Sequence, residues 1–202
     1  DPNPWLLDRF LVLVSTSGVK PLICFNKVDL TKDGQVELVS RYREIYPLVV
    51  ISAKTGEGLE LLCQALGGKV SVFAGPSGVG KSTILNALHP GLALKTAEIS
   101  AKLKRGRHTT RHVELIAMPQ GGFVADTPGF SSLDLPDIKP EELSGHYPEM
   151  DAYFGKCRFN QCLHDREPDC AVKGAVESGL INKERYFQYL EFLKELKERR
   201  RY

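Results

Sequence analysis

The chain has 202 residues, 42% of them hydrophobic, and its 27 basic and 25 acidic side chains leave a formal net charge of +2. This length can bury one full core and a smaller appended unit, so we expect one main domain and one satellite. Neither a run of about 18 consecutive apolar residues nor a charged-then-apolar leader occurs, so no membrane span or signal peptide is predicted. We expect a soluble, cytoplasmic monomer with no membrane partner.

The first two thirds of the chain alternate short apolar runs with segments of helical periodicity. Asn3 before Pro4 is typical of a helix start, and apolar residues at helical spacing predict a helix that ends near Gly18. Alternating strands and helices predict an α/β sheet with ligand groups at the carboxyl ends of its strands. The further expected elements are a strand over 21–25, a helix over 34–45, a strand over 48–51, a helix over 59–66, a strand over 70–74, a helix over 81–88, and paired strands over 112–118 and 122–125.

The last third of the chain shows helical spacing without strands. We therefore predict a main domain over 1–138 and a small helical domain over 139–202, which ends in a long helix over 183–201. One side of that helix is apolar and is expected to be core rather than a binding stripe. Its residues are Tyr186, Tyr189, Leu190, Leu193 and Leu196.

Residues 75–82 match the phosphate-binding pattern G-x-x-x-x-G-K-[ST] between a predicted strand and a predicted helix. The glycines let the backbone aim several N–H groups at a phosphate, at a helix start where the dipole favours negative charge. Lys81 adds positive charge near the β- and γ-oxygens, and the Ser82 hydroxyl can ligate Mg²⁺. A nucleoside triphosphate is the predicted ligand, and an ordinary glycine turn is the alternative. The predicted contacts are Gly75, Pro76, Ser77, Gly78, Val79, Gly80, Lys81, Ser82 and Thr83.

Asp126 ends a predicted strand and opens the pattern D-x-x-G, which closes at Gly129. In this pattern the carboxylate holds Mg²⁺ through water and the glycine amide meets the γ-phosphate. A carboxylate at a strand end is more often a plain turn cap. Its combination with the phosphate loop favours the nucleotide role.

The sequence N-K-V-D at residues 26–29 matches a guanine-binding pattern, and an ordinary strand-to-turn sequence is the alternative. A carboxylate such as Asp29 can accept hydrogen bonds from both the ring N1–H and the exocyclic amine of guanine, whereas adenine presents the opposite pattern. The motif normally follows the phosphate loop but here precedes it, so we predict a nucleotide site assembled from a permuted chain. The predicted base-site residues are Asn26, Lys27, Asp29, Ser52, Ala53 and Lys54.

Three cysteines cluster with one histidine in a short stretch, namely Cys157, Cys162, His164 and Cys170. Three thiolates and one imidazole form a tetrahedral donor set suited to Zn²⁺ with no open position, which predicts a structural site. With an apparent binding energy on the order of 10 kcal/mol, zinc could decide whether this unit folds. Unpaired reduced thiols are the alternative, whereas the remaining cysteines lie in apolar runs and are expected to be core.

Five segments in this order resemble the circularly permuted GTPases of the bacterial ribosome small-subunit-dependent family, RsgA. They are N-K-V-D at 26–29, S-A-K-T-G at 52–56, G-P-S-G-V-G-K-S at 75–82, G-R-H-T-T at 106–110 and D-T-P-G-F at 126–130. The resemblance implies a three-layer P-loop NTPase fold with motif order G4-G5-G1-G2-G3, followed by a small α-helical zinc-binding domain.

The same resemblance implies hydrolysis of GTP to GDP with Mg²⁺, and the small (30S) ribosomal subunit and its rRNA as partners. The family's N-terminal oligonucleotide-binding barrel and one central strand have no counterpart in this sequence, so we expect that upstream residues belong to the protein.

Hydrolysis also needs a residue that orients the attacking water. Ras-like proteins place a glutamine directly after D-x-x-G, but here Phe130 stands there. The resemblance implicates His108, although such a histidine is otherwise often only an exposed polar residue, and Thr109 or Thr110 is expected to close over Mg²⁺. We therefore expect slow intrinsic hydrolysis that a partner accelerates by ordering residues 95–111. The predicted catalytic residues are His108, Lys81, Thr109, Thr110 and Gly129.

Two other functions stay open from the sequence. One is an ATP-using P-loop kinase or ATPase, and the other is a zinc-stabilised RNA-binding module whose nucleotide site is only a regulatory switch. Two basic stretches could contact phosphate backbones or could simply be solvated. They comprise Lys102, Lys104, Arg105, Arg107 and Arg111, and then Lys194, Lys197, Arg199, Arg200 and Arg201.

Overall fold

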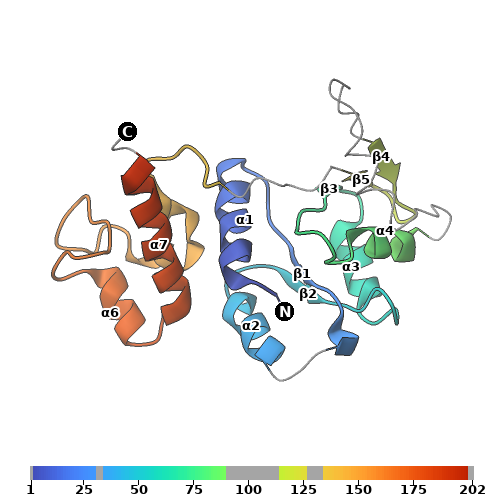
Figure 1. Cartoon of the computed structure of the whole chain (residues 1–202), viewed down its shortest axis with the longest axis horizontal. Coiled ribbons are helices and arrows are strands. Elements are labelled where there is room, and N and C mark those ends of the chain that lie inside the picture. Colours follow the sequence, from blue (N-terminus) through green and yellow to red (C-terminus); the bar gives the residue numbers. More distant parts are fainter. Residues whose placement is uncertain (1, 31–33, 90–113, 127–133, 200–202) are drawn as a thin grey trace. The chain divides into compact units, whose positions relative to one another are not determined.

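The computed structural model describes residues 2–30, 34–89, 114–126 and 134–199. The chain packs into two compact units, each built from segments that are not contiguous in sequence (Figure 1). We call the first the sheet unit; it comprises Leu22–Val39 and Pro47–Ser132. We call the second the helical unit; it comprises Asp1–Pro21, Ser40–Tyr46 and Leu133–Tyr202.

Strands and helices alternate along the sheet unit, as the sequence predicts. The predicted bounds of the helices over 59–66 and 81–88 are confirmed, whereas the first three strands are shorter than the predicted runs and the last is shifted by one residue. The strands are β1 (Ile23–Phe25), β2 (Leu48–Val50), β3 (Val70–Val72), β4 (Glu114–Ala117) and β5 (Phe123–Asp126). The helical elements are η1 (Val28–Leu30), α3 (Leu59–Leu66) and α4 (Lys81–Leu88).

The described strands form two sheets rather than the single predicted sheet. β1 pairs in parallel with β2, and β5 lies between β3 and β4, parallel to β3 and antiparallel to β4. The division arises because, among the described residues, no strand pairs with both β1 and β3. The predicted pairing of the last two strands is confirmed, with a turn over Pro119-Gln120-Gly121-Gly122 between them.

One core holds the sheet unit together. Ile116 and Val124 of the three-stranded sheet are buried in the same cluster as residues of α3 and α4. α3 begins in close contact with β2: a Cβ on Gly58 would lie only 2.3 Å from the Val50 carbonyl oxygen. Gly58 also has φ of 72°. Glycine alone tolerates both conditions. The helix residues in this cluster are Leu62, Leu66, Ile84, Leu85 and Leu88.

The helical unit begins with a capped helix, as predicted. The Asn3 side chain accepts a hydrogen bond of 3.2 Å from the Leu6 N–H, and Pro4 is the first helical residue. The elements are α1 (Pro4–Thr16), the end of α2 (Gly34–Arg43), η3 (Pro140–His146), η4 (Pro148–Tyr153), α6 (Ala171–Glu177) and α7 (Lys183–Arg199).

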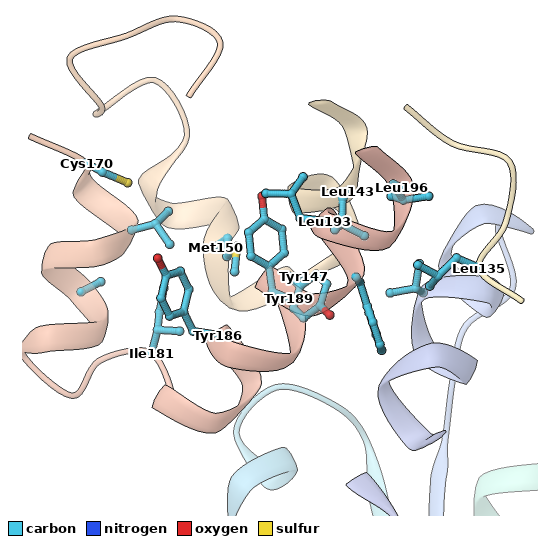
Figure 2. Close-up of a cluster of buried hydrophobic side chains, with 14 residues drawn as sticks. Leu135, Leu143, Tyr147, Met150, Cys170, Ile181, Tyr186, Tyr189, Leu193 and Leu196 are labelled. Atoms are coloured by element: carbon cyan, nitrogen blue, oxygen red, sulfur yellow. The ribbon is translucent and has the colours of Figure 1, made fainter. Parts of the chain in front are cut away.

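The apolar side of α7 is the centre of the helical unit (Figure 2). Four of its five predicted core residues are buried and Leu190 is partly buried, which confirms that this stripe is core. Tyr147 packs edge-on against Tyr189 with ring centroids 5.3 Å apart, and Leu143 and Met150 lie in the same cluster. The stripe therefore holds η3 and η4 onto α7.

A buried ionic cluster ties α1 to α7 within the helical unit. The Arg185 guanidinium donates to Asp8 of α1 and to Glu149 of η4, and both Asp8 and Arg185 are 1% exposed. Tyr42 and Tyr147 face the guanidinium at 5.0 and 5.2 Å from their ring centroids. Burial raises the pKa of Asp8 to about 6, although the positive charge of Arg185 opposes this shift.

These contacts explain why α1 packs in one compact unit with residues 133–202. The division into domains over 1–138 and 139–202 stays a prediction. Across the described ranges, no helix combines the length and the apolar character that crossing a bilayer requires.

Candidate nucleotide site and metal centre

The predicted phosphate loop links β3 to α4, as its pattern requires. α4 begins at Lys81 after Gly80, so the first N–H groups of the helix lie at the end of the loop. The Lys81 ammonium folds back over the loop and donates to the carbonyl oxygens of Gly75 at 2.6 Å and Pro76 at 3.1 Å. Amide donors and one positive charge therefore lie together where an anionic phosphate would bind.

Asn26 joins three of the predicted motifs. It directly follows β1, and its side-chain amide donates to the Val79 carbonyl of the phosphate loop at 2.9 Å. Its amide oxygen accepts a hydrogen bond of 3.0 Å from the Ala53 N–H. A Cβ on Gly80 would lie 2.4 Å from the Asn26 amide nitrogen, so glycine is required for this approach.

Lys27 adds a second bond between the base-site loop and the phosphate loop. Its ammonium donates to the Gly78 carbonyl oxygen at 2.6 Å. Its backbone has φ of 72°, which non-glycine residues rarely adopt and which is typical of functional sites. The two loops, about 50 residues apart in sequence, are therefore held side by side.

Asp29 is oriented by Ser52, which is fully buried. The Ser52 hydroxyl donates to an Asp29 carboxylate oxygen at 2.7 Å and accepts a bond of 3.1 Å from the Thr55 N–H. This arrangement fixes the carboxylate and leaves acceptor capacity for a base. Lys54 follows on the exposed surface.

Asp126 is the last residue of β5, and only its backbone is described. Because β5 is parallel to β3, the ends of both strands lie at the same edge of the sheet, where the phosphate loop begins. Ser82 and Thr83 lie in the first turn of α4. The other predicted residues of the catalytic group, His108, Thr109, Thr110 and Gly129, lie outside the described residues.

The predicted metal donors converge in the helical unit. The donor atoms of Cys157, Cys162, His164 and Cys170 all lie within 4.8 Å of one another. The two sulfurs of Cys157 and Cys170 are 3.8 Å apart, and the His164 Nδ1 lies 3.6 and 3.3 Å from them. A tetrahedral zinc ion with ordinary bond lengths places two sulfurs about 3.8 Å apart and sulfur and nitrogen about 3.5 Å apart. Cys157, His164 and Cys170 match these spacings and Cys162 lies within 4.8 Å of each, so the four residues form a donor set suited to Zn²⁺.

The surroundings of this cluster act differently on its four donors. Burial raises the pKa of Cys162 to about 12 and also raises that of Cys170, which favours the thiol over the thiolate at these two positions. Burial alone would raise the pKa of Cys157, but hydrogen bonds from the backbone of Ala171 and Val172, at the start of α6, hold that pKa below its usual value. Burial lowers the pKa of His164, which favours the neutral imidazole that metals bind.

Two tyrosines of α7 hold the metal-binding loop in place. The Tyr186 hydroxyl donates to the His164 carbonyl at 2.7 Å, and the Tyr189 hydroxyl donates to the Leu163 carbonyl at 2.8 Å. The sequence predicted both residues as core and missed these polar contacts. A tyrosine within an apolar stripe of the sequence indicates such a polar contact, because a buried hydroxyl needs a hydrogen-bond partner.

A family model described as RsgA GTPase matches residues 1–136. The chain belongs to the RsgA GTPase family. It is 52% identical over 201 residues to the "Small ribosomal subunit biogenesis GTPase RsgA" of Moorella thermoacetica, covering 99% of this chain and 69% of that protein. It is also 52% identical over 201 residues to the protein of the same name from Bacillus velezensis, covering 96% and 68%.

Two solved structures share this fold. YjeQ from Thermotoga maritima matches with a TM-score of 0.84 and 40% identity, over 97% of this chain and 66% of that one. YloQ, described as a circularly permuted GTPase, matches with a TM-score of 0.78 and 41% identity, over 98% and 64%. The predicted RsgA family, permuted α/β fold and enzyme class, a GTPase, are confirmed. The chain spans about two thirds of the length of these RsgA relatives.

Proposed function

We propose that this chain binds GTP with Mg²⁺, hydrolyses it to GDP and phosphate, and acts in the assembly of the small ribosomal subunit. The observation that carries the nucleotide site is a pair of hydrogen bonds: the Asn26 side chain donates to the Val79 carbonyl and accepts from the Ala53 N–H. One side chain there joins the base-site segments to the phosphate loop. The relatives named as small ribosomal subunit biogenesis GTPases support the biological role.

Each motif has one task in this proposal. Asp29 accepts from the guanine edge, and the loop amides and Lys81 neutralise the β- and γ-phosphates, with Ser82 and Asp126 as the groups that hold Mg²⁺. When bound there, Mg²⁺ would supply positive charge that stabilises the transferring phosphoryl group. The Lys81 ammonium donates hydrogen bonds to the carbonyl oxygens of Gly75 and Pro76. When the nucleotide binds, Lys81 exchanges these carbonyl oxygens for phosphate oxygens.

The water-orienting residue in this proposal is His108, with Thr109 or Thr110 over Mg²⁺. The support comes from the sequence, because Phe130 after D-x-x-G has no group that can hold a water. His108→Ala is expected to lower turnover far more than GTP affinity. His112→Ala, a second histidine just beyond the G-R-H-T-T segment, is the matched control and should leave both unchanged. Equal turnover of His108→Ala and wild type contradicts the assignment.

The partner in this proposal is the small ribosomal subunit with its rRNA, encountered in the cytoplasm, and the chain acts as a monomer. Zn²⁺ bound by Cys157, Cys162, His164 and Cys170 stabilises the helical unit without joining the reaction. The basic stretches supply phosphate contacts, and binding of the subunit accelerates an intrinsically slow hydrolysis.

The test is GTP turnover measured with and without purified small ribosomal subunits, on the chain in the context of its full-length protein. Stimulated release of phosphate from GTP and none from ATP is expected. Turnover of ATP would instead favour an ATP-using enzyme. Bound GTP that stays uncleaved in a single-turnover experiment, with subunits present, would favour an RNA-binding module with a regulatory nucleotide site.

A further inference from the structure

A hollow between α1 and α7 of the helical unit is explained neither by the nucleotide site nor by the metal site. Its volume is about 250 Å³, and it is lined by Trp5 and Arg9 of α1 and by five residues of α7 within 191–198. One of these five, Phe192, is fully buried and joins the hollow to the core of the unit. We call this hollow the Trp5 groove.

The Trp5 ring already holds one cation. The Arg9 guanidinium carbon lies 3.9 Å from the centroid of the indole, and Phe192 packs against the same ring with centroids 5.7 Å apart. Trp5 nevertheless remains 40% exposed, so part of the indole is open at the groove. Tryptophan is the best cation–π acceptor among the side chains. Because a single exposed apolar residue is ordinary on a protein surface, the charges around the ring decide what it can bind.

Three glutamates of α7 line the groove, and two of them are open to a ligand. Glu195 accepts hydrogen bonds from Arg9 and, at 2.6 Å, from Arg199. Glu191 lies four residues before Glu195 and Glu198 lies three residues after it, which places all three on one side of the helix. Both Glu191 and Glu198 are exposed, and across the described part of the chain neither forms an ion pair.

The lining is acidic on balance. Arg9 and Glu195 neutralise each other, which leaves Lys194 as the other cation against the two open carboxylates and gives the lining a net charge of −1. Lys194 is exposed, and its long side chain can turn its ammonium toward water. The groove therefore combines an open indole with an excess of negative charge.

This combination fits a basic peptide segment best. The carboxylates repel the phosphates of a nucleic acid and the side chains of an acidic peptide. A neutral apolar ligand would use the indole but would leave both carboxylates without a role. An arginine suits both parts, because its planar guanidinium stacks on an aromatic ring and donates in a fork to a carboxylate.

We propose that the Trp5 groove binds a basic, arginine-bearing segment of another protein, with a guanidinium on the Trp5 ring and paired to Glu191 or Glu198. The choice of a protein of the small ribosomal subunit as the source of this segment rests on the proposed function. Within that function the groove gives the helical unit a contact with protein rather than with RNA.

The experiment measures fluorescence anisotropy of a fluorescein-labelled peptide of Arg-Gly repeats, titrated with the zinc-loaded full-length protein. Labelled peptides of Glu-Gly repeats and a labelled oligouridine are the comparison probes. Trp5→Leu keeps an apolar contact with Phe192 but removes the ring, and it should weaken binding of the Arg-Gly peptide by roughly 2- to 30-fold. Glu191→Gln/Glu198→Gln should weaken it by roughly 2- to 25-fold.

Two further variants test whether the effect belongs to the groove. Asp151→Asn/Glu177→Gln is the matched control, because it removes two exposed carboxylates of the same unit that do not line the groove. It should bind the Arg-Gly peptide as the wild type does. Lys194→Gln should bind the peptide more tightly, because it removes a repelling charge. Zinc content, the urea midpoint and GTP turnover without subunits should be the same in all these proteins.

Equal binding of the Arg-Gly peptide by wild type, Trp5→Leu and Glu191→Gln/Glu198→Gln overturns the proposal, and so does an equal loss in Asp151→Asn/Glu177→Gln. Preferential binding of the Glu-Gly peptide or of oligouridine also overturns it. Unchanged binding of purified small subunits by the groove variants would exclude a subunit protein as the source. Groove-dependent peptide binding without subunit-stimulated GTP turnover would sink the proposed function and leave peptide binding by the groove standing.

Discussion

Replacing Asn26 with alanine removes the side chain on which the assembly of the nucleotide site depends. The change deletes the hydrogen bond of 2.9 Å to the Val79 carbonyl and that of 3.0 Å from the Ala53 N–H. Each such bond contributes about 1 kcal/mol, and a buried partner left unsatisfied adds a further penalty. Val79 and Ala53 are only partly buried, so water relieves part of that penalty.

The expected loss of GTP binding free energy is therefore about 2–3 kcal/mol, or roughly 30- to 150-fold in affinity. Fluorescence titration with methylanthraniloyl-GTP measures it directly. Asn26→Asp should retain the acceptor for Ala53 but place a carboxylate against the Val79 carbonyl oxygen, so it should not restore binding. Asn160→Ala is the control, because Asn160 is an exposed asparagine of the helical unit.

Unchanged GTP affinity in Asn26→Ala would show that nucleotide binding does not depend on this side chain. A variant that binds GTP normally but unfolds at a lower temperature would show that the bridge is only structural. A loss of affinity for GTP with the same loss of thermal stability in Asn160→Ala would point to a nonspecific effect of the substitutions.

Three further predictions concern the helical unit. Burial raises the pKa of Asp8 from 3.8 to about 6, so the folded state is stabilised when the Asp8 carboxyl is protonated. This stabilisation is complete below pH 3.8 and is lost as the pH rises through 6. When the pH is lowered from about 7.5 to about 5.5, the free energy of unfolding of wild type, measured by urea titration, should rise by about 1 kcal/mol relative to that of Asp8→Asn. The same dependence of unfolding free energy on pH in both proteins would contradict this. Arg185→Met leaves Asp8 and Glu149 buried without their cation and should cost about 3–5 kcal/mol, visible as a lower urea midpoint; an unchanged midpoint would show that the cluster adds nothing. Cys170→Ser should reduce bound zinc, measured by mass spectrometry, and expose α7 to proteolysis; full zinc occupancy would exclude Cys170 as a ligand.

Much of the nucleotide site could be predicted because each motif is contiguous in sequence. The phosphate loop carries its own helix start, and the predicted helix over 81–88 has the observed bounds. The sequence also predicted Asn26 as part of the base site. It could not supply the partner atoms, because the contacts with Val79 and Ala53 depend on which strands lie side by side.

The packing of the helical unit was harder to predict for the same reason. α1 was expected from its cap and periodicity, but nothing local in Asp8 indicates that its partner is Arg185, which lies 177 residues away. Charged residues are expected on the surface unless a partner is known. The metal donors were predictable, since their chemistry and spacing are local, whereas the supporting hydroxyls of Tyr186 and Tyr189 depend on the fold.

In the proposed function, separated motifs form one guanine site in which Asp29 selects the base. The direct measurement compares the affinities of wild type and Asp29→Asn for GTP and for xanthosine triphosphate, which carries an oxygen where guanine has its exocyclic amine. Wild type should prefer GTP, and the variant should lose GTP affinity while gaining affinity for xanthosine triphosphate, because an amide donor now faces that oxygen. Equal preference for GTP in both proteins would show that Asp29 does not select the base.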